Sequence, residues 1–280
     1  MADQQAADAE AAVTGAEKPL MAGRRGLIMG VANDHSIAWG IAQALHRHGA
    51  ELAFTYQGEA FAKRVVPLAR SLGATITLSC DVASQGDRDQ TVRALGDAWG
   101  RIDFIVHAVA YSDKAELKGR YVDTTRENFL RTLDISCFSF TALAKLAAPL
   151  MTDGGALVTL SYLGADRVMP NYNVMGVAKA ALEASVRYLA VDLGGQGVRV
   201  NAISAGPMRT LAGSAIGDAR YVYRYNQENS PLRRNVSLDE VGGAALYLLS
   251  DLSSGVSGEV LMVDSGFHAI GIPVPKKGEE

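Results

Sequence analysis

The stretch "RGLIMGVANDHSIAWGIAQAL", residues 25–45, decides the fold that the sequence predicts. Residues 25–30 form a nearly continuous apolar run, which is typical of a short strand covered on both faces. A helical pattern follows, from Ser36 as a possible N-cap to Gly49 as a typical helix-ending residue. The stretch therefore predicts a strand, a tight loop and a helix in succession.

The same alternation of short apolar runs and longer helical patterns continues along the chain. Further strands are predicted at residues 51–57, 74–80, 102–108, 155–161, 198–204 and 258–264. Repeated strand–helix units form right-handed crossovers and a parallel sheet. We therefore predict an α/β fold, a single doubly wound Rossmann domain over residues 23–272 with about seven parallel strands and helices on both faces.

Two predicted helices carry more specific signals. Pro67 interrupts the helical pattern that ends at Gly73, so this helix is expected to break or bend there. Ser237 and Glu240 stand three residues apart at the start of another helix, which is the pattern of a capping box.

Three segments lie outside the predicted strand–helix units. Residues 1–22 are acidic and Ala-rich, and we predict a disordered N-terminal tail. Residues 205–231 form a long irregular insertion after a strand, at the sheet edge where ligands bind, and we predict a substrate lid there. Residues 273–280 are predicted as a C-terminal tail.

Bulk composition argues against several classes of function. The chain has 280 residues, of which 48% are hydrophobic and 20% charged, an ordinary globular balance. Its formal net charge of -3 argues against nucleic acid or an anionic membrane as the main partner. No apolar run approaches the roughly 18 residues of a membrane-spanning helix. Cys80 and Cys137 suggest no disulfide framework, so we predict a cytoplasmic protein, and we predict no metal site.

The loop after the first strand has the features of a dinucleotide-binding turn, although it lacks the G-x-G-x-x-G pattern. Gly30 ends the strand, Ala32 is small, and Ser36 and Ile37 open the helix. A pyrophosphate needs small residues at the turn and backbone N–H groups at a helix N-terminus, and this loop offers both. A generic strand–loop–helix turn has the same pattern, so the loop alone leaves both interpretations open.

Residues at the ends of the next strands strengthen the dinucleotide interpretation. Gln57 ends the second strand, where an adenosine-ribose contact is expected, and a neutral side chain without a clear phosphate clamp favours NADH over NADPH. Asp81 could accept a hydrogen bond from the adenine amino group while Val82 packs on the ring, or Asp81 could cap the next helix. His107 is interpreted as a hydrogen-bonded strand residue rather than a catalyst.

Tyr172 and Lys179 are the candidate catalytic residues. They stand seven residues apart, which is two helical turns, so both side chains share a face. A phenol has a pKa near ~10, and a nearby ammonium would favour the phenolate and strengthen a hydrogen bond to a developing oxyanion. An amphipathic helix with a chance tyrosine and lysine is the alternative. Tyr188, further along the same helix, is expected to serve in packing.

Together these motifs resemble the short-chain dehydrogenase/reductase superfamily, and more narrowly the bacterial NADH-dependent enoyl-[acyl-carrier-protein] reductases. The resemblance covers residues 24–272 and rests on "GVANDHSIAWGIA", "ELAFTYQ", "CDV", "TLSYLGADRVMPNYNVMGVAKA", "GVRVNAISAGPMRTLA" and "SGEVLMVDSGF". Ordinary members of the superfamily have three residues between the catalytic Tyr and Lys, and a serine upstream. Here six residues separate Tyr172 from Lys179 and the upstream polar residue is Tyr162, a combination that characterises the enoyl reductases.

The resemblance implies a role for each matched residue. Tyr172 would donate a hydrogen bond to the thioester carbonyl oxygen, Lys179 would bind the nicotinamide ribose, and Tyr162 would support Tyr172 as a second active-site tyrosine. The residues implied to line the cofactor are Gly30, Ser36, Ile37, Gln57, Asp81, Val82, Val109, Lys179, Met208, Arg209, Thr210, Leu211 and Ala212. Those implied to contact substrate are Ser112, Tyr172 and Met175.

The resemblance also implies a reaction and partners. NADH would reduce the trans-2 double bond of an enoyl thioester in the last step of the fatty acid elongation cycle. The acyl carrier protein would deliver the substrate, with Arg220 and Arg224 on the lid as basic residues for docking. A homotetramer is implied, built through the long helices after the fourth and fifth strands and the C-terminal strand region. Ala110 and Tyr111 replace the Gly-Phe pair that the family often has; the extra methyl of Ala110 could narrow the nicotinamide side of the cleft, and Tyr111 adds a hydroxyl.

Two other functions fit parts of the pattern. A 3-oxoacyl or other carbonyl reductase of the same superfamily would share the fold and the cofactor. A non-catalytic dinucleotide-binding protein would need neither Tyr172 nor Lys179. The longer spacing favours the enoyl reductase, because its substrate oxygen lies two atoms beyond the hydride acceptor and one further helical turn moves the phenol by roughly 5 Å.

Overall fold

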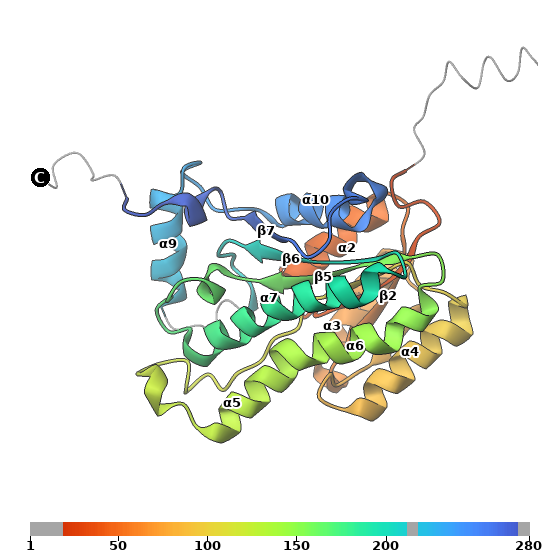
Figure 1. The fold of residues 1–280 in the computed structure, drawn as a ribbon, viewed down its shortest axis with the longest axis horizontal. Coiled ribbons are helices and arrows are strands. Elements are labelled where there is room, and N and C mark those ends of the chain that lie inside the picture. The colour runs from red at the N-terminus through yellow and green to blue at the C-terminus, as the bar shows by residue number, and fades with distance from the viewer. Residues whose placement is uncertain (1–18, 212–217, 274–280) are drawn as a thin grey trace, which may run out of the picture.

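The computed structural model describes residues 19–211 and 218–273 (Figure 1). Residues 1–18 of the predicted N-terminal tail, residues 274–280 of the predicted C-terminal tail and Ala212 of the predicted cofactor set lie outside the described residues. The packed domain begins before the predicted boundary at residue 23. Met21 is fully buried in the core, and its N–H donates to the carbonyl oxygen of His48 at 2.9 Å.

The predicted doubly wound sheet is present and has seven parallel strands in the order β3-β2-β1-β4-β5-β6-β7. Their bounds are β1 (Arg25–Met29), β2 (Glu51–Tyr56), β3 (Ile76–Ser79), β4 (Phe104–His107), β5 (Gly155–Ser161), β6 (Val198–Ala205) and β7 (Val260–Val263). The strand order reverses between β1 and β4, so the crossovers separate there and open a crevice at the carboxyl ends of these strands. The fold class predicted from the sequence is confirmed.

Helices cover both faces of this sheet (Figure 1). One face carries α2 (Ile37–Arg47), α3 (Gly58–Ser71) and α10 (Leu238–Leu249). The other carries α4 (Gln85–Trp99), α6 (Ser139–Ala147) and α7 (Asn173–Gly194), with α5 (Arg126–Leu133) packed on α7. Helix α9 (Ala219–Asn229) stands at the end of the sheet. The short helical turns are η1 (Tyr121–Asp123), η2 (Asp134–Phe138), η3 (Ala148–Leu150), η4 (Leu163–Ala165), η5 (Asp251–Ser253) and η6 (Phe267–Ala269).

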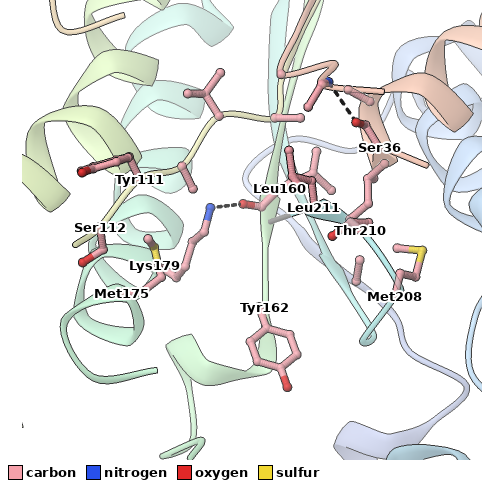
Figure 2. A pocket seen from close by; sticks show the side chains of 18 of the residues that line it. Ser36, Tyr111, Ser112, Leu160, Tyr162, Met175, Lys179, Met208, Thr210 and Leu211 are labelled. Atoms are coloured by element: carbon pink, nitrogen blue, oxygen red, sulfur yellow. Dashed lines mark hydrogen bonds between the residues drawn. The ribbon is translucent and has the colours of Figure 1, made fainter. Parts of the chain in front are cut away.

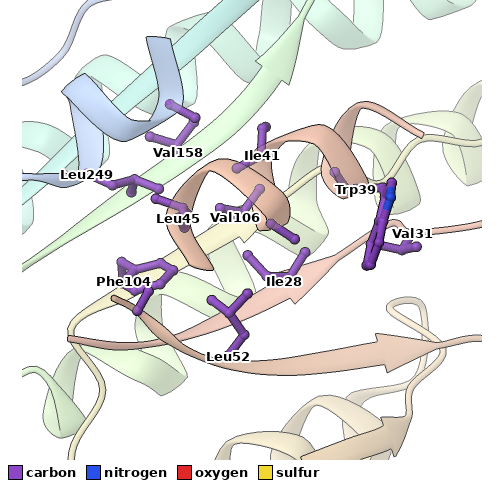
Figure 3. Packing of buried hydrophobic residues seen from close by; sticks show 14 of the residues in the cluster. Ile28, Val31, Trp39, Ile41, Leu45, Leu52, Phe104, Val106, Val158 and Leu249 are labelled. Carbon is purple, nitrogen blue, oxygen red and sulfur yellow. The ribbon is translucent and has the colours of Figure 1, made fainter. Parts of the chain in front are cut away.

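The two faces of the sheet bury separate apolar clusters, because successive strand residues point to opposite sides. Ile28 of β1 packs with Ile41 and Leu45 of α2 on one face (Figure 3). Its neighbours Leu27 and Met29 belong to the cluster on the other face, beneath α4, α6 and α7. This double covering explains why the strands read as continuous apolar runs rather than as alternating patterns.

Helix α3 runs through Pro67 without a break, so of the two predicted effects the break is wrong and the bend stays a prediction. Pro67 lacks the N–H that would bond to the carbonyl of Lys63, four residues earlier. Both residues are exposed, so water can satisfy that carbonyl group. Val65 and Ala69 are fully buried on the opposite side and hold the helix against the sheet.

The predicted capping box at the start of α10 is confirmed. The Ser237 hydroxyl accepts from the N–H of Glu240 at 3.2 Å, and the Glu240 carboxylate accepts from the N–H of Ser237 at 2.8 Å. The guanidinium of Arg234 also bonds to Glu240 and, as the largest cause, lowers the pKa of that carboxyl group to about 2. The start of α10, which packs against α2, is therefore fixed by charged and neutral hydrogen bonds.

The helices α5, η2, α6 and η3 join into one segment of 25 residues, Arg126–Leu150. By length and composition alone this segment is apolar enough to cross a membrane, since an 18-residue window within it has a mean hydropathy of 1.3. The lengths of the apolar runs in the sequence did not predict such a segment. Its inner side packs against α4 and α7, as a helix on the core of an α/β domain does. At its centre, η2 is a π-helix, a local widening that often occurs at functional sites.

Candidate active site

A cavity of about 1800 Å³ lies at the carboxyl ends of the central strands, where the strand order reverses. Its wall is built from the β1–α2 loop, the ends of β2, β3, β4 and β5, the start of α7, the loop after β6, and α9. Every described residue of the predicted cofactor set lines it, namely Gly30, Ser36, Ile37, Gln57, Asp81, Val82, Val109, Lys179, Met208, Arg209, Thr210 and Leu211. Ser112, Tyr162, Tyr172 and Met175 line the same cavity, so the structure brings the whole described set together.

The β1–α2 loop forms a cradle of backbone atoms. Gly30 has φ +96°, and a Cβ at this position would lie 2.0 Å from the carbonyl oxygen of Ala108 on the neighbouring strand end, so only glycine fits. Helix geometry leaves the N–H groups of the first turn without partners inside the helix. Two of these, on Ile37 and Ala38, belong to residues of the cavity wall. The donor set therefore fits the phosphates of a dinucleotide.

Ser36 occupies the N-cap position of α2, but its hydroxyl makes no capping bond to the helix. It accepts instead from the N–H groups of Ala32 at 2.9 Å and Asn33 at 3.1 Å (Figure 2). Ser36 is therefore the N-cap residue, as expected, but its side chain folds the loop back on itself instead of bonding to the helix. As a result the amides of Ala32 and Asn33 are occupied, and the first turn of α2 supplies donors toward the cavity.

The residues predicted at the adenosine end lie at the ends of β2 and β3. Gln57 follows β2 at the N-cap position of α3, with no side-chain capping bond. The carboxylate of Asp81 accepts from the N–H of Ala83 at 2.9 Å, whereas the cap of α4 is Ser84. The alternative in which Asp81 caps that helix is therefore wrong. Its contact with an adenine amino group stays a prediction.

His107 is a buried strand residue, as interpreted from the sequence. Its ring nitrogens lie 3.2 Å from the Thr159 hydroxyl and 2.9 Å from the Ser139 hydroxyl. Burial, with the nearby Lys179 charge, lowers the pKa of His107 to about 3, so the ring is neutral. His107 therefore joins β4, β5 and α6 rather than acting on a ligand.

Tyr172 and Lys179 share one side of α7, as predicted. Tyr172 is the N-cap residue and Lys179 lies two turns further along, and each is only 6% exposed. The amine of Lys179 donates to the carbonyl oxygen of Leu160 in β5 at 2.6 Å (Figure 2). Both side chains line the cavity, so the two groups face the space where a nicotinamide and a substrate would meet.

Tyr162 and Tyr172 form a packed pair. Their ring centroids are 5.1 Å apart and the rings meet edge to face at 73°, an arrangement that aromatic rings favour. Gly164, in the turn between them, is required because a Cβ there would lie 2.4 Å from the ring of Tyr172. The hydroxyl-bearing ring of Tyr162 therefore fixes the position of Tyr172.

The protonation of the three groups follows from their burial. Burial, with smaller effects of Tyr162 and Glu183, raises the pKa of Tyr172 well above its usual value, and burial raises the pKa of Tyr162 to about 12. Burial lowers the pKa of Lys179 to about 8. The expected preference for a phenolate at Tyr172 is not met. Tyr172 is instead a neutral hydroxyl that can donate a hydrogen bond.

The opposite wall of the cavity depends on the π-helix η2, which sequence reasoning missed. Ser136 in η2 accepts from the N–H of Tyr111 at 2.9 Å and donates to its carbonyl oxygen at 3.0 Å. The guanidinium of Arg131 lies 4.6 Å from the centre of the Tyr111 ring. η2 therefore holds the backbone at Tyr111, and the neighbouring Ser112 hydroxyl accepts from Thr132 of α5 at 2.9 Å. The letters "DISCF" contain no signal that distinguishes a π turn from an α turn.

The predicted lid is partly helical. Residues 219–229 of the predicted irregular insertion form α9, which turns Arg220 and Arg224 toward the cavity mouth. The guanidinium of Arg209, in the loop after β6, lies 4.7 Å from the centre of the Tyr223 ring on α9. Loop and helix are thus in direct contact across the cavity. Residues 212–217 of the predicted lid lie outside the described residues.

Comparison with known proteins bears directly on this site. A family model described as enoyl-(acyl carrier protein) reductase matches residues 30–268. The chain belongs to this enoyl reductase family. The match spans the Gly30 cradle, the tyrosine pair and Lys179, and it confirms the family and the oxidoreductase class predicted from the sequence.

Individual members of the enoyl reductase family are similar over nearly the whole chain. Enoyl-[acyl-carrier-protein] reductase [NADH] 1 of Rhizobium meliloti (strain 1021) is 64% identical over 253 residues, which are 90% of this chain and 93% of the relative. Enoyl-[acyl-carrier-protein] reductase [NADH] FabI of Salmonella typhimurium is 52% identical over 248 residues, 88% of this chain and 95% of the relative.

Solved structures of the family share the fold. The Anaplasma phagocytophilum reductase in complex with NAD has a TM-score of 0.89 and 60% identity, covering 91% of this chain and 98% of that one. The Bacillus cereus reductase with NADP+ and indole naphthyridinone has a TM-score of 0.89 and 49% identity, covering 90% and 99%. The chain is therefore similar in fold to a member solved with NAD and to one solved with NADP+.

Proposed function

We propose that this protein is an NADH-dependent enoyl-[acyl-carrier-protein] reductase that reduces the trans-2 double bond of enoyl thioesters in the last step of fatty acid elongation. The observation that carries the proposal is the position of Tyr172 and Lys179, seven residues apart in sequence, on one wall of the cavity that also contains the Gly30 cradle. Relatives at 52% to 64% identity bear this name. We also propose a cytoplasmic location, which membership of a family of fatty acid synthesis enzymes supports.

The roles of the cofactor-binding residues follow from the cavity wall. The first turn of α2 holds the pyrophosphate, Gln57 and Asp81 hold the adenosine end, and Lys179 holds the nicotinamide ribose. A neutral Gln57 leaves the ribose 2′ position without a phosphate partner, which supports NADH over NADPH. When bound, the nicotinamide supplies the hydride that reduces C3 of the enoyl group.

Tyr172 stabilises the charge that this reduction creates. Addition at C3 moves an electron pair toward the thioester carbonyl oxygen, giving an enolate. The neutral hydroxyl of Tyr172 donates a hydrogen bond to that oxygen, and the Lys179 ammonium adds positive charge nearby. Tyr162 holds the Tyr172 ring from the side, so we assign it a positioning role rather than a direct one. C2 then takes a proton to complete the saturated product.

The acyl carrier protein is the proposed substrate carrier. Arg220 and Arg224 of α9 lie at the cavity wall and present positive charge where an acidic carrier would dock. A homotetramer is also proposed. Phe138, Tyr188 and Val191 are 52%, 77% and 80% exposed, and they stand on η2 and α7, the helical segments expected at the subunit interface. Large apolar side chains in such positions support a covered surface.

The test of the proposal compares substrates and cofactors in one assay. Crotonoyl and acetoacetyl thioesters are offered with NADH and with NADPH, and oxidation of the cofactor is followed by absorbance. Turnover of the crotonoyl thioester with NADH is the expected result. Turnover of acetoacetyl thioester alone would identify a carbonyl reductase, and NADH binding without any turnover would identify a dinucleotide-binding protein.

A further inference from the structure

Tyr172 stands in a strained turn between two asparagines. Asn171 has φ 54° and Asn173, the first residue of α7, has φ 37°. Both values lie in the left-handed region, which glycine, asparagine and aspartate adopt more readily than other residues. Such a backbone persists only where surrounding contacts hold it, and it occurs most often at functional sites. The contacts of the two asparagine side chains therefore decide where the phenol is placed.

Asn173 ties this turn to the loop after β4, which forms the substrate side of the cavity. Its side-chain amide donates to the carbonyl oxygens of Glu116 at 3.1 Å and Gly119 at 3.4 Å. Leu117 lies between these two acceptors in the chain, is 5% exposed and belongs to the same apolar cluster as Tyr172. The amide therefore holds the loop at the point where an apolar side chain packs near the Tyr172 ring.

The loop after β4 is anchored on its other side by the side chain of Glu116. This carboxylate accepts from the N–H of Thr125 at 3.0 Å, from the Thr125 hydroxyl at 2.8 Å and from the side-chain amide of Asn128 at 3.2 Å. These bonds join the loop to the start of α5. Because the loop is fixed there, it offers Asn173 two acceptors at set positions, and the tie can define the position of Tyr172.

Asn171 ties the same turn to α9, a separate part of the cavity wall. Its side-chain amide donates to the carboxylate of Asp218 at 2.7 Å, and Asp218 is the N-cap residue of α9. A hydrogen bond to a charged acceptor is stronger than one between neutral groups. The two asparagines thus connect the turn that carries Tyr172 to two segments of the wall that are far apart in sequence.

We propose that Asn171 and Asn173 are positioning residues that set the Tyr172 hydroxyl relative to the thioester carbonyl oxygen, an inference that rests on the enoyl reductase function. Neither asparagine belongs to the cavity wall, whereas Tyr172 between them does. They therefore act on the reaction through Tyr172, while Tyr162 supports its ring from another side. A catalytic group displaced by about 1 Å can lower a rate about 100-fold, so the ties matter to the chemical step.

Asn173→Asp is the first test. Aspartate has nearly the same shape and tolerates a positive φ, but its carboxylate cannot donate to the two carbonyl oxygens. An acidic residue is favourable in the first turn of a helix, so a role in starting α7 alone would be retained. We expect the single-turnover rate with NADH and a crotonoyl thioester to fall by about 10- to 100-fold, with an unchanged dissociation constant for NADH. Asn229→Asp is the matched control, because the Asn229 amide donates within α9, and it should react at the unmodified rate.

A double-variant cycle with Tyr172→Phe separates positioning from a general structural role. Asn173→Asp should slow Tyr172→Phe very little, because the hydroxyl that the asparagine positions is already absent. A fall in rate of equal size with and without the Tyr172 hydroxyl would overturn the proposal. An unchanged rate in Asn173→Asp, or a fall accompanied by weaker NADH binding, would overturn it as well.

Exchange of the two partners tests the tie to α9. Asn171→Asp places two carboxylates against each other and should slow the single turnover several-fold without weakening NADH binding. Adding Asp218→Asn restores a donor and an acceptor in reversed order, and both exchanged side chains tolerate the φ values of 54° and 56° at these positions. The double variant should therefore regain most of the lost rate.

A double variant no faster than Asn171→Asp would overturn the role of Asn171, and so would an Asn171→Asp variant as fast as the unmodified protein. Absence of enoyl turnover in the unmodified protein would contradict the proposed function instead, so the two failures are distinguishable.

Discussion

The amine of Lys179 in α7 donates a hydrogen bond of 2.6 Å to the carbonyl oxygen of Leu160 near the carboxyl end of β5. This bond joins α7, a helix of 22 residues, to a central strand, at the point where both reach the cavity wall. It holds the amine in place while leaving two of its three N–H groups for a ligand. Several consequences of this arrangement can be measured.

Replacing Lys179 by methionine should weaken NADH binding by about 10- to 100-fold, because a charged hydrogen bond contributes roughly 1.5–3 kcal/mol. Methionine keeps most of the apolar stem, so the fold should persist. Fluorescence titration with NADH measures the change. Lys145→Met, on the exposed side of α6, is the control. An unchanged dissociation constant for Lys179→Met would favour a packing role for this lysine.

Stability should depend on pH through the same residue. Burial lowers the pKa of Lys179 from 10.5 to about 8, so between these values the unfolded chain binds more protons than the folded one. The free energy of unfolding contributed by Lys179 therefore rises as pH increases from about 8 to 10.5, and its unfavourable contribution is complete below about 8. Urea unfolding at several pH values should show this rise, and Lys179→Met should remove it. If the free energy of unfolding rises with pH to the same extent in Lys179→Met, groups other than Lys179 cause the rise.

Replacing Gly30 by alanine should damage both stability and cofactor binding. The added Cβ would lie 2.0 Å from the Ala108 carbonyl oxygen, and φ +96° is unfavourable for any side chain. We expect a loss of stability of at least about 1 kcal/mol, with NADH binding too weak to titrate. Gly243→Ala, where the added Cβ meets no atom within 4 Å, is the matched control. Normal NADH affinity in Gly30→Ala would show that the backbone can move away and that the cradle is not required.

Replacing Ser136 by alanine should affect substrate more than cofactor. The variant leaves the N–H of Tyr111 without its acceptor in a partly buried loop, at a cost of about 1–3 kcal/mol in the free energy of unfolding. Since Tyr111 and Ser112 lie on the substrate side, KM for the enoyl thioester should rise several-fold while KM for NADH stays constant. An equal rise in KM for the enoyl thioester and in KM for NADH would contradict the assignment of Tyr111 and Ser112 to the substrate end of the cavity.

The sequence predicted the sheet well because its strands are buried on both faces. Runs such as residues 25–30 and 155–161 are continuously apolar, and β5 has the bounds that the pattern predicted. The capping box at Ser237 was also visible, since it depends on residues that are close in sequence. The absence of a break at Pro67 was not predictable, because tolerance of proline depends on whether solvent can satisfy a carbonyl group, and that is set by the position of the helix in the fold.

The sequence predicted which residues line the cavity, but not how their side chains are oriented and bonded. Tyr188 was expected to pack, yet it is 77% exposed. Helix α7 is rich in apolar residues on more than one side, so the pattern does not specify which side meets the sheet. The roles of Ser36 and Ser136 depend on loops that fold back across 4 and 25 residues, and no local pattern records those contacts. The raised pKa of Tyr172 follows from burial, which only the assembled cavity reveals.

The central claim is that the neutral hydroxyl of Tyr172 stabilises an enolate beside the bound nicotinamide. Tyr172→Phe tests it most directly, by parallel measurement of single-turnover NADH oxidation with a crotonoyl thioester and of NADH affinity. We expect a rate lower by about 10²–10³, equivalent to roughly 2.7–4 kcal/mol, with an NADH dissociation constant changed by less than about twofold. A single-turnover rate equal to that of the unmodified protein would contradict the account.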